Sequence, residues 1–305
     1  MNVGICIVFY NDFEHLNRLS NAILSLDYKS IRVYFTDHHP DKIHVEAFMK
    51  YFPESIYEES IQNAGFAAGN NRLAKKAVSE GCKYIWILNP DMEPKKDCLT
   101  ELVYCLQSEI LTEAVGPVLL YGEKSRKQLI QFAGAYVDFK TQNKTAIFVN
   151  ETIENLPKKL SQKVDLINGG SLLIKSTRVE YENLFDEEYF MYNDELDLMR
   201  RIRNNQMEVR IAYLAVCGHH HDWSKKNKRA HELMYYYMMR NKILYWRKYK
   251  YYWMQFQFAF VFLVKLPIIA RFCINLSGTK LLYYYYLGLL HGYLGKKGKS
   301  DLFNK

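Results

Sequence analysis

Short apolar runs alternate with amphipathic stretches along most of this chain. Residues 3–9, 31–35, 84–88, 114–120, 172–174 and 209–216 have the length and composition of buried strands. Residues 14–26, 73–80 and 99–111 carry apolar side chains at helical spacing. This alternation predicts an α/β fold, and the opening β-α-β order favours a parallel sheet with a right-handed crossover.

The strand at residues 84–88 ends in Asn89, Pro90 and Asp91. Pro90 and Pro94 are expected to end the strand and stiffen the turn. Ligands of open α/β sheets bind outside the carboxyl ends of the strands, so a carboxylate there can hold a divalent cation and, through it, a diphosphate. An ordinary polar turn after a core strand is the alternative.

Two other strand ends carry polar residues. Tyr10 and Asn11 follow the first strand, and Asp37 follows the second, where an acid often bonds a nucleotide's ribose or base. No GxGxxG motif follows the first strand, which argues against a dinucleotide-binding Rossmann protein. Residues 62–72 are rich in Gly, Ala and Asn and precede a predicted helix. They are predicted to form a loop whose backbone can approach a bound ligand closely, or a loop that only caps the helix.

Carboxylates gather at the start of an amphipathic helix, at Asp194, Glu195 and Asp197. Acids in a first turn suit the helix dipole, so a structural explanation exists. Three acids exceed what a cap needs, and one is a candidate general base.

The last predicted strand ends in three consecutive histidines. His219 and His221 project to one side if the chain is extended, which makes this pair a candidate for metal ligation. A surface loop is the alternative interpretation.

The C-terminal part is basic and aromatic. The net charge of the chain is +8, and most of the surplus lies toward the C-terminus. Residues 251–290 are aromatic and aliphatic, but Lys265, Pro267 and Arg271 interrupt them, and a spanning helix needs about 20 mostly apolar residues. Interfacial helices at a membrane surface are therefore predicted, with packing on the domain or in a homodimer as the alternative.

The cysteines and the N-terminus indicate a cytoplasmic setting. The six cysteines form no CxxC pair, so neither a zinc site nor a disulfide framework is expected. Met1 leads directly into the first strand, and no signal peptide is visible.

Taken in order, these motifs resemble the family-two glycosyltransferases, in particular the bacterial rhamnosyltransferase-like branch. The Arg240-Asn241 pair and the closing glycine pattern from Gly288 to Gly298 resemble that branch as well. The resemblance covers roughly residues 3–245 and rests on segments 8–11, 36–38, 63–71, 88–91, 185–187 and 190–198.

The resemblance implies a GT-A fold, which is a Rossmann-like mixed sheet flanked by helices, followed by C-terminal amphipathic helices. The GT-A domain would span residues 1–230, with a nucleotide-sugar half at about 1–120 and an acceptor half at about 121–230. Residues 231–305 would associate with a membrane or a subunit. The implied activity is inverting, metal-dependent transfer from a UDP- or dTDP-linked sugar to a lipid-linked glycan. Capsule or O-antigen synthesis at the inner face of the plasma membrane is the implied setting.

The resemblance also assigns the site residues. Asp91 would bind Mg²⁺ or Mn²⁺, with His219 or His221 as further ligands. The usual Glu-Asp-x-Asp motif reads Asp194-Glu195-Leu196-Asp197, which leaves the base open between Asp194 and Glu195. Gly169, Gly170 and Asp197 would lie on the acceptor side. The donor pocket would be lined by Tyr10, Asn11, Asp37, Asn63, Gly69, Asn70, Asn71 and Asn89.

Two other classes of protein are weighed. A nucleotidyltransferase should carry a glycine- and lysine-rich phosphate loop near the first strand, and none is present. A non-enzymatic module that binds a membrane or nucleic acid would explain the basic C-terminal part but not the acids at the strand ends. No nucleic-acid partner is expected for the enzyme.

Overall fold

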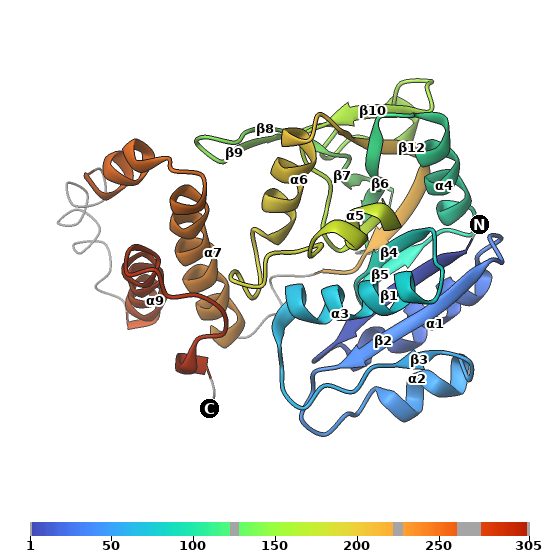
Figure 1. The fold of residues 1–305 in the computed structure, drawn as a ribbon, viewed down its shortest axis with the longest axis horizontal. Coiled ribbons are helices and arrows are strands. Elements are labelled where there is room, and N and C mark those ends of the chain that lie inside the picture. The colour runs from blue at the N-terminus through green and yellow to red at the C-terminus, as the bar shows by residue number, and fades with distance from the viewer. Residues whose placement is uncertain (1, 123–127, 222–227, 261–275, 304–305) are drawn as a thin grey trace. The chain divides into compact units, whose positions relative to one another are not determined.

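The computed structural model describes residues 2–122, 128–221, 228–260 and 276–303 (Figure 1). The chain forms two compact units. The first consists of Met1–Val137, Lys144–Asp186 and Glu195–His221, and the second of Asp138–Asn143, Glu187–Asp194 and Asp222–Lys305.

Within the described residues, the first unit is built on a mixed sheet of ten strands. The order across the sheet is β10-β12-β6-β11-β4-β1-β2-β3, with β5 paired to β12 and β7 paired to β6. The strands are β1 (Val3–Phe9), β2 (Ile31–Asp37), β3 (Ile56–Tyr57), β4 (Tyr84–Leu88), β5 (Met92–Pro94), β6 (Thr112–Tyr121), β7 (Ile130–Phe132), β10 (Ser161–Val164), β11 (Ser171–Lys175) and β12 (Glu208–His219).

The sheet confirms the predicted mixed α/β architecture. β1 runs parallel to β2 and β4, and β12 runs parallel to β6. β11 lies between β4 and β6 and is antiparallel to both. As a result, the C-terminal end of β4 lies next to the segment that enters β11.

Helices cover both faces of this sheet (Figure 1). The helical segments of the first unit are η1 (Phe13–His15), α1 (Leu16–Ser25), α2 (Val45–Tyr51), α3 (Gly65–Ser79), α4 (Cys98–Ser108), η2 (Ile153–Asn155), α5 (Ser176–Tyr181) and α6 (Asp194–Asn204), of which Asp194 belongs to the second unit.

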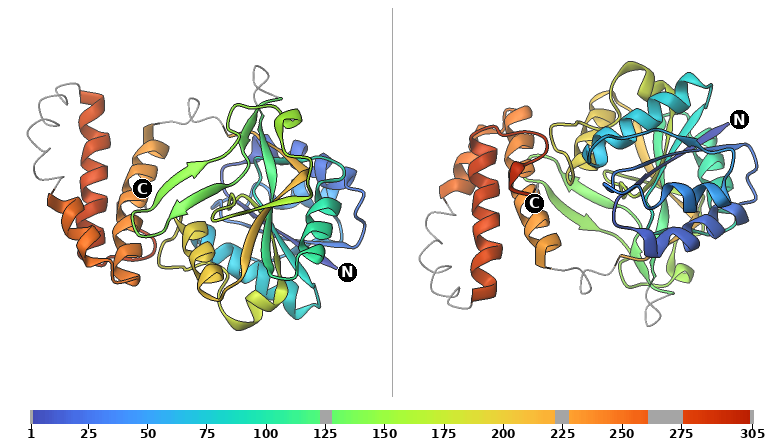
Figure 2. Two further views of the ribbon diagram at one scale, coloured as in Figure 1. Left: turned by 90° about the horizontal axis from the view of Figure 1, so that it is seen from above. Right: turned by 90° about the horizontal axis from the view of Figure 1, so that it is seen from below.

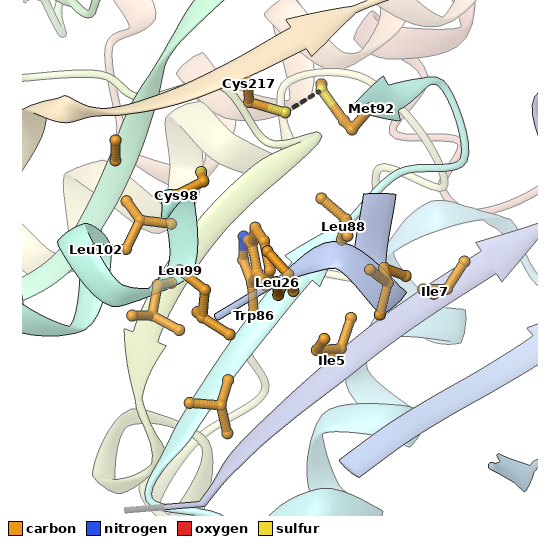
Figure 3. Packing of buried hydrophobic residues seen from close by; sticks show 14 of the residues in the cluster. Ile5, Ile7, Leu26, Trp86, Leu88, Met92, Cys98, Leu99, Leu102 and Cys217 are labelled. Carbon is orange, nitrogen blue, oxygen red and sulfur yellow. Dashed lines mark hydrogen bonds between the residues drawn. The ribbon is translucent and has the colours of Figure 1, made fainter. Parts of the chain in front are cut away.

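The strands are buried on both sides, which explains their nearly continuous apolar sequences. Alternate residues of β1, such as Ile5 and Ile7, join Trp86 of β4 in a core that also contains side chains of α1 and α4 (Figure 3). On the other face, a Cβ atom at Gly4 would lie 2.7 Å from Ala77 Cβ of α3, so α3 packs directly on the backbone of β1. Successive side chains of β1 thus point to opposite faces of the sheet, with α1 and α4 packed on one face and α3 on the other.

α3 begins earlier than its sequence indicates. It starts at Gly65 rather than at residue 73, so most of the predicted glycine-rich loop is helical. Gly65 has φ +88, and the Asn63 side chain accepts a hydrogen bond from its N–H. A Cβ atom at Gly69 would lie 2.9 Å from Val8 Cγ2 and from His38 Cε1. The small residues therefore let the helix approach the sheet closely. Because they are not apolar at helical spacing, the sequence pattern did not indicate a helix there.

The second unit is mainly helical. It contains α7 (Lys228–Lys248), a helix at residues 252–260, α9 (Leu276–Tyr293) and η4 (Asp301–Phe303). It also includes the tip of the hairpin formed by β8 (Ala135–Asp138) and β9 (Asn143–Ala146). α7 and α9 lie side by side (Figure 2), and a Cβ atom at Gly292 would lie 2.8 Å from the Arg240 carbonyl oxygen. Among the described residues, no helix has the length and hydropathy needed to cross a membrane.

Candidate donor and metal site

Asp91 and two of the three histidines meet at the C-terminal edge of the sheet. Asp91 Oδ2 lies 3.1 Å from His221 Nδ1 and 3.4 Å from His219 Nε2. The three potential ligand atoms lie within 4.8 Å of one another. β5 brings them together, because its antiparallel pairing with β12 sets His219 opposite Met92 and the His220 N–H donates to the Asp91 carbonyl oxygen at 2.8 Å.

Two features of this cluster suit a bound cation. Among the described residues, buried Asp91 Oδ1 has no hydrogen-bond partner. His219 Nδ1 donates to Gln131 Oε1, which leaves its Nε2 lone pair directed toward the Asp91 side of the ring. A carboxylate oxygen and an imidazole lone pair repel each other unless a proton or a cation lies between them. One carboxylate with two imidazoles is a donor set that fits Mn²⁺ better than Mg²⁺.

The electrostatics of Asp91 favour its charged form. Burial by itself would raise its pKa, but the interactions with the neighbouring His219 and His221 rings outweigh burial and lower the pKa well below the usual range. Asp91 is therefore an ionised carboxylate at neutral pH, as a cation ligand must be.

The loop before β11 connects this cluster to Glu195. A Cβ atom at Gly169 would lie 3.3 Å from Glu195 Cβ, and one at Gly170 would lie 3.0 Å from Asn89 Nδ2. The Asn89 N–H donates to the Gly170 carbonyl oxygen at 2.7 Å. Two consecutive glycines thus let the exit of β4 and the first turn of α6 approach one loop from two sides.

The acidic residues at the start of α6 differ in exposure. The Glu195 side chain is 25% exposed, and its Oε1 lies 3.6 Å from Lys144 Nζ. Asp194, in the second unit, is only 1% exposed. Asp197 is fully buried and its Oδ2 accepts a hydrogen bond from Arg201 Nε at 2.9 Å, so in this conformation it holds Arg201 and offers no surface to an acceptor. The sequence motif does not show which face of α6 is buried, and a role for Asp197 on the acceptor side stays a prediction.

Asp37 has internal partners in this structure, and its contact with a base stays a prediction. It is fully buried, and its oxygens accept hydrogen bonds from the N–H groups of His39 and His44, both at 2.9 Å. His44 Nδ1 lies 3.0 Å from Asp37 Oδ2, and Phe9 stacks on the His44 ring. Since all of these partners are internal, Asp37 organises the loop after β2. The neighbouring Tyr10, at the end of β1, is 44% exposed, and Asn11 is exposed too.

The predicted donor residues of α3 are mostly structural in this conformation. Asn71 Nδ2 donates to the Phe185 carbonyl oxygen and its Oδ1 accepts from the Phe185 N–H, both at 2.8 Å. Asn70 Nδ2 donates to the Phe66 carbonyl oxygen, and both asparagines are buried. Asn63 and Gly69 determine where α3 begins and how closely it packs. These residues therefore build the scaffold beside the strand ends.

Some polar residues that contact the cluster or Glu195 escaped the sequence interpretation. Gln131 and Lys144 come from the mixed segment after β6, which has no clear periodicity. His220 turns away from Asp91, pairs with Glu93, and lines a cavity of about 770 Å³ that Arg18 and Lys95 also line. Successive side chains point to opposite sides of an extended chain, which explains why His220, at the end of β12, faces away from His219 and His221.

In the second unit, two buried side chains hold the segment that precedes α6. Asn241 Nδ2 lies 2.7 Å from the Met191 carbonyl oxygen and 2.9 Å from that of Tyr192, and Arg240 Nη2 donates to the Tyr189 carbonyl oxygen at 2.7 Å. Phe190, Tyr192 and Asn193 have φ values of 68, 65 and 67, a left-handed conformation that is costly for residues other than glycine. The hydrogen bonds stabilise this strained turn.

Comparison with known proteins identifies the family. The model of glycosyl transferase family 2 matches residues 4–163, slightly more than half of the chain. This chain belongs to glycosyl transferase family 2. The matched part of the family 2 chain contains β1, β4, Asp91 and Gln131. Glu195, His219 and His221 lie beyond it. A search of curated proteins found no significant match.

Solved structures share the fold of this family 2 protein at 12% sequence identity. GalNAc-T7, in a crystal structure with UDP, GalNAc and Mn²⁺, has a TM-score of 0.63 over 81% of this chain and 48% of its own. TarS 1–349 of S. aureus has a TM-score of 0.52 over 80% of this chain and 65% of its own. The chain thus spans about half the length of GalNAc-T7 and about two thirds of TarS 1–349. These likenesses confirm the GT-A-like fold.

Proposed function

We propose that this chain transfers a sugar, with inversion, from a UDP- or dTDP-linked donor to a glycan acceptor. The observation that carries the proposal is the cluster of Asp91, His219 and His221 at the strand ends of a family 2 chain. When bound there, a divalent cation supplies positive charge that offsets the charge of the departing diphosphate. UDP in the structures of GalNAc-T7 and TarS supports a UDP-linked donor as the first to test.

Glu195 is the general base in this proposal. Inversion needs one base on the face opposite the leaving group, within hydrogen-bond reach of the acceptor hydroxyl. Glu195 is supported over Asp194 because its carboxylate is partly exposed, whereas Asp194 is almost fully buried. Gly169 and Gly170, which face Glu195 and Asn89, are proposed to leave room for the acceptor.

The biological setting is proposed from the motif resemblance. The chain would belong to the rhamnosyltransferase-like branch, transfer a hexosyl group, and act in capsule or O-antigen synthesis. Its acceptor would be a lipid-linked glycan at the inner face of the plasma membrane, where the protein would be peripheral. The basic, aromatic C-terminal part of the sequence supports this location.

Substitution of the two acids separates their roles. With a donor found by screening nucleotide sugars with Mn²⁺, we expect Glu195→Gln to lower kcat about 10²–10⁴-fold, as loss of a general base does. Asp194→Asn should change kcat much less, and Glu180→Gln, at an exposed glutamate on α5, is the control. Normal turnover by Glu195→Gln, with folding intact by circular dichroism, would contradict the assignment.

Donor binding can be measured without an acceptor. A nucleoside diphosphate should raise the unfolding temperature only when Mn²⁺ is present, because the cation is proposed to join the diphosphate to Asp91. The absence of any shift with UDP, GDP and dTDP would contradict the proposed function and favour a non-enzymatic binding module. Release of pyrophosphate from a nucleoside triphosphate and a sugar phosphate would instead indicate a nucleotidyltransferase.

A further inference from the structure

The C-terminal segment has an unusual distribution of charge. Residues 233–300 contain eleven Lys or Arg and no Asp or Glu, although the whole chain has 41 basic and 33 acidic residues. The remaining residues therefore carry a net charge of −3. The positive net charge of the protein comes entirely from this one segment, which lies within the second unit.

The same segment exposes large apolar side chains at helical spacing. Trp253, Phe256 and Phe260 of the helix at residues 252–260 are 61%, 60% and 61% exposed. They occur at positions i, i+3 and i+7, so they lie along one face of that helix. Tyr283 and Leu290, seven residues apart on α9, are also more than half exposed.

An apolar groove lies between these two helices. It has a volume of about 450 Å³ and is lined by Phe258 and Ala259 from one helix and by residues such as Leu287 and Leu290 from α9. Lys250 precedes the first helix by two residues, and Lys280 precedes Tyr283 by three; both lysines are exposed. Apolar and aromatic side chains with flanking lysines are the composition of helices that lie in a membrane interface.

We infer that this face of the second unit docks on an anionic phospholipid surface. Aromatic side chains of the helix at 252–260 and of α9 enter the boundary between headgroups and acyl chains, and the exposed Lys250 and Lys280 meet the lipid charge. The charge of the segment favours this partner over a second copy of itself, because the segment has no acidic residue with which the basic residues of another copy could pair. The groove is lined by leucines and an alanine together with tyrosines and Phe258, an apolar and aromatic surface that suits acyl chains next to the headgroups.

This inference rests on the membrane location in the proposed function and adds which surface of the protein binds and which lipid charge it needs. Its test requires no sugar transfer. The full chain is sedimented with vesicles of phosphatidylcholine, with and without phosphatidylglycerol, in the absence of nucleotide. We expect binding only to the anionic vesicles, and weaker binding as salt rises. Because donor binding is measured without vesicles, either proposal can fail while the other stands.

Two sets of variants test the surface. A triple variant replaces the three exposed aromatic residues of the helix by serine (Trp253→Ser, Phe256→Ser and Phe260→Ser). It should lower the partition coefficient of the protein onto anionic vesicles at least about tenfold, since exposed aromatic area drives insertion. Lys250→Gln and Lys280→Gln should each lower it roughly fivefold on anionic vesicles. The matched controls are Tyr104→Ser and Tyr181→Ser, which remove exposed aromatic side chains of the first unit and should leave binding unchanged.

Trp253 also reports insertion directly. Trp86 and Trp246 are almost fully buried, and Trp223 lies outside the described residues, so the Trp253→Phe variant makes the assignment. A blue shift in fluorescence on adding anionic vesicles that is lost in this variant would place Trp253 in the bilayer interface. Protein that stays in the supernatant with anionic vesicles, or a triple variant that sediments like the parent, would overturn the proposal. So would binding to an oligonucleotide instead, or a dimer in light scattering that the triple variant dissociates without any vesicle binding.

Discussion

Asp91 has one oxygen without a hydrogen-bond partner in the described structure and the other beside two imidazoles. Gln131 adds a constraint on one of those rings, since it fixes the His219 tautomer. The hydrogen-bonding partners that the described residues offer to this carboxylate are imidazoles, which also bind metals. The arrangement therefore leads to measurements on the metal.

Asp91→Asn should lower the affinity for Mn²⁺ more than about 100-fold, because it removes a charged ligand. Loss of a residue that only orients a metal ligand already lowers metal affinity about 10–100-fold. Gln131→Leu should lower it about 10–100-fold by releasing the His219 ring. Electron paramagnetic resonance of free Mn²⁺ in a titration measures both. Asp97→Asn, at an exposed aspartate, is the control. Unchanged Mn²⁺ affinity in Asp91→Asn would exclude this cluster as the metal site.

Asp37 gives a prediction for stability and its pH dependence. Burial would raise its pKa, but hydrogen bonds from His44 and His39 outweigh burial and lower the pKa below the usual value. A lowered carboxyl pKa stabilises the fold above the unfolded-state pKa of about 4, and this stabilisation is lost as the pH falls.

Asp37→Asn should therefore lower the free energy of unfolding by about 2–4 kcal/mol at neutral pH, since it breaks buried hydrogen bonds to a charged group. The difference from the parent should shrink as the pH falls below about 4. Urea denaturation at several pH values measures it, with the exposed neighbour Asp41→Asn as the control. A difference that stays constant down to acid pH would show that the charge of Asp37 has no part in stability.

At the scale of elements, the second unit contains a strained turn that directly precedes Glu195 in the chain, and a pair of closely packed helices. α7 supplies Arg240 and Asn241 to the left-handed turn that leads into α6, whose second residue is Glu195. α9 approaches α7 so closely at Gly288 that a Cβ atom there would overlap the Tyr236 carbonyl oxygen. The Arg-Asn pair and the glycines near the C-terminus thus have physical roles in the second unit.

Asn241→Leu should lower the free energy of unfolding of the second unit by about 3 kcal/mol, because buried carbonyl groups lose their donor. We also expect kcat to fall more than donor affinity, because the turn precedes Glu195 in the chain. Urea denaturation and steady-state kinetics test this, with Gln257→Leu, at an exposed amide, as the matched control. An equal loss of kcat and of donor affinity would argue against a positioning role for Asn241.

At the scale of the whole molecule, the two units are proposed to meet different ligands. Hydrogen exchange should show that UDP with Mn²⁺ protects amides around β5 and the end of β12 and leaves α9 unchanged. Anionic vesicles should protect the helix at 252–260 and α9 and leave β5 unchanged. Both patterns follow from local protection at each binding surface. Protection of the helix at 252–260 by UDP with Mn²⁺ would contradict this division of roles.

Local patterns in the sequence determined most elements of the fold. β1, β4 and α1 were predictable because apolar periodicity and turn residues act over a few positions. Asp91 at a strand end, and His219 and His221 on one side of a strand, were predictable for the same reason. The beginning of α3 was not, because glycine and asparagine are poor helix formers and packing against β1 overrides that preference.

Only the tertiary structure decided which residues meet. Asp91 lies 130 positions from His221, and Asn71 lies 114 positions from Phe185, so no local signal records either contact. The same holds for the burial of Asp37 and Asp197, whose carboxylates look like ligand contacts in the sequence and are held by internal donors in the structure. Sequence periodicity specifies which face of an element is apolar, whereas the packing of distant elements decides which polar groups remain open to a ligand.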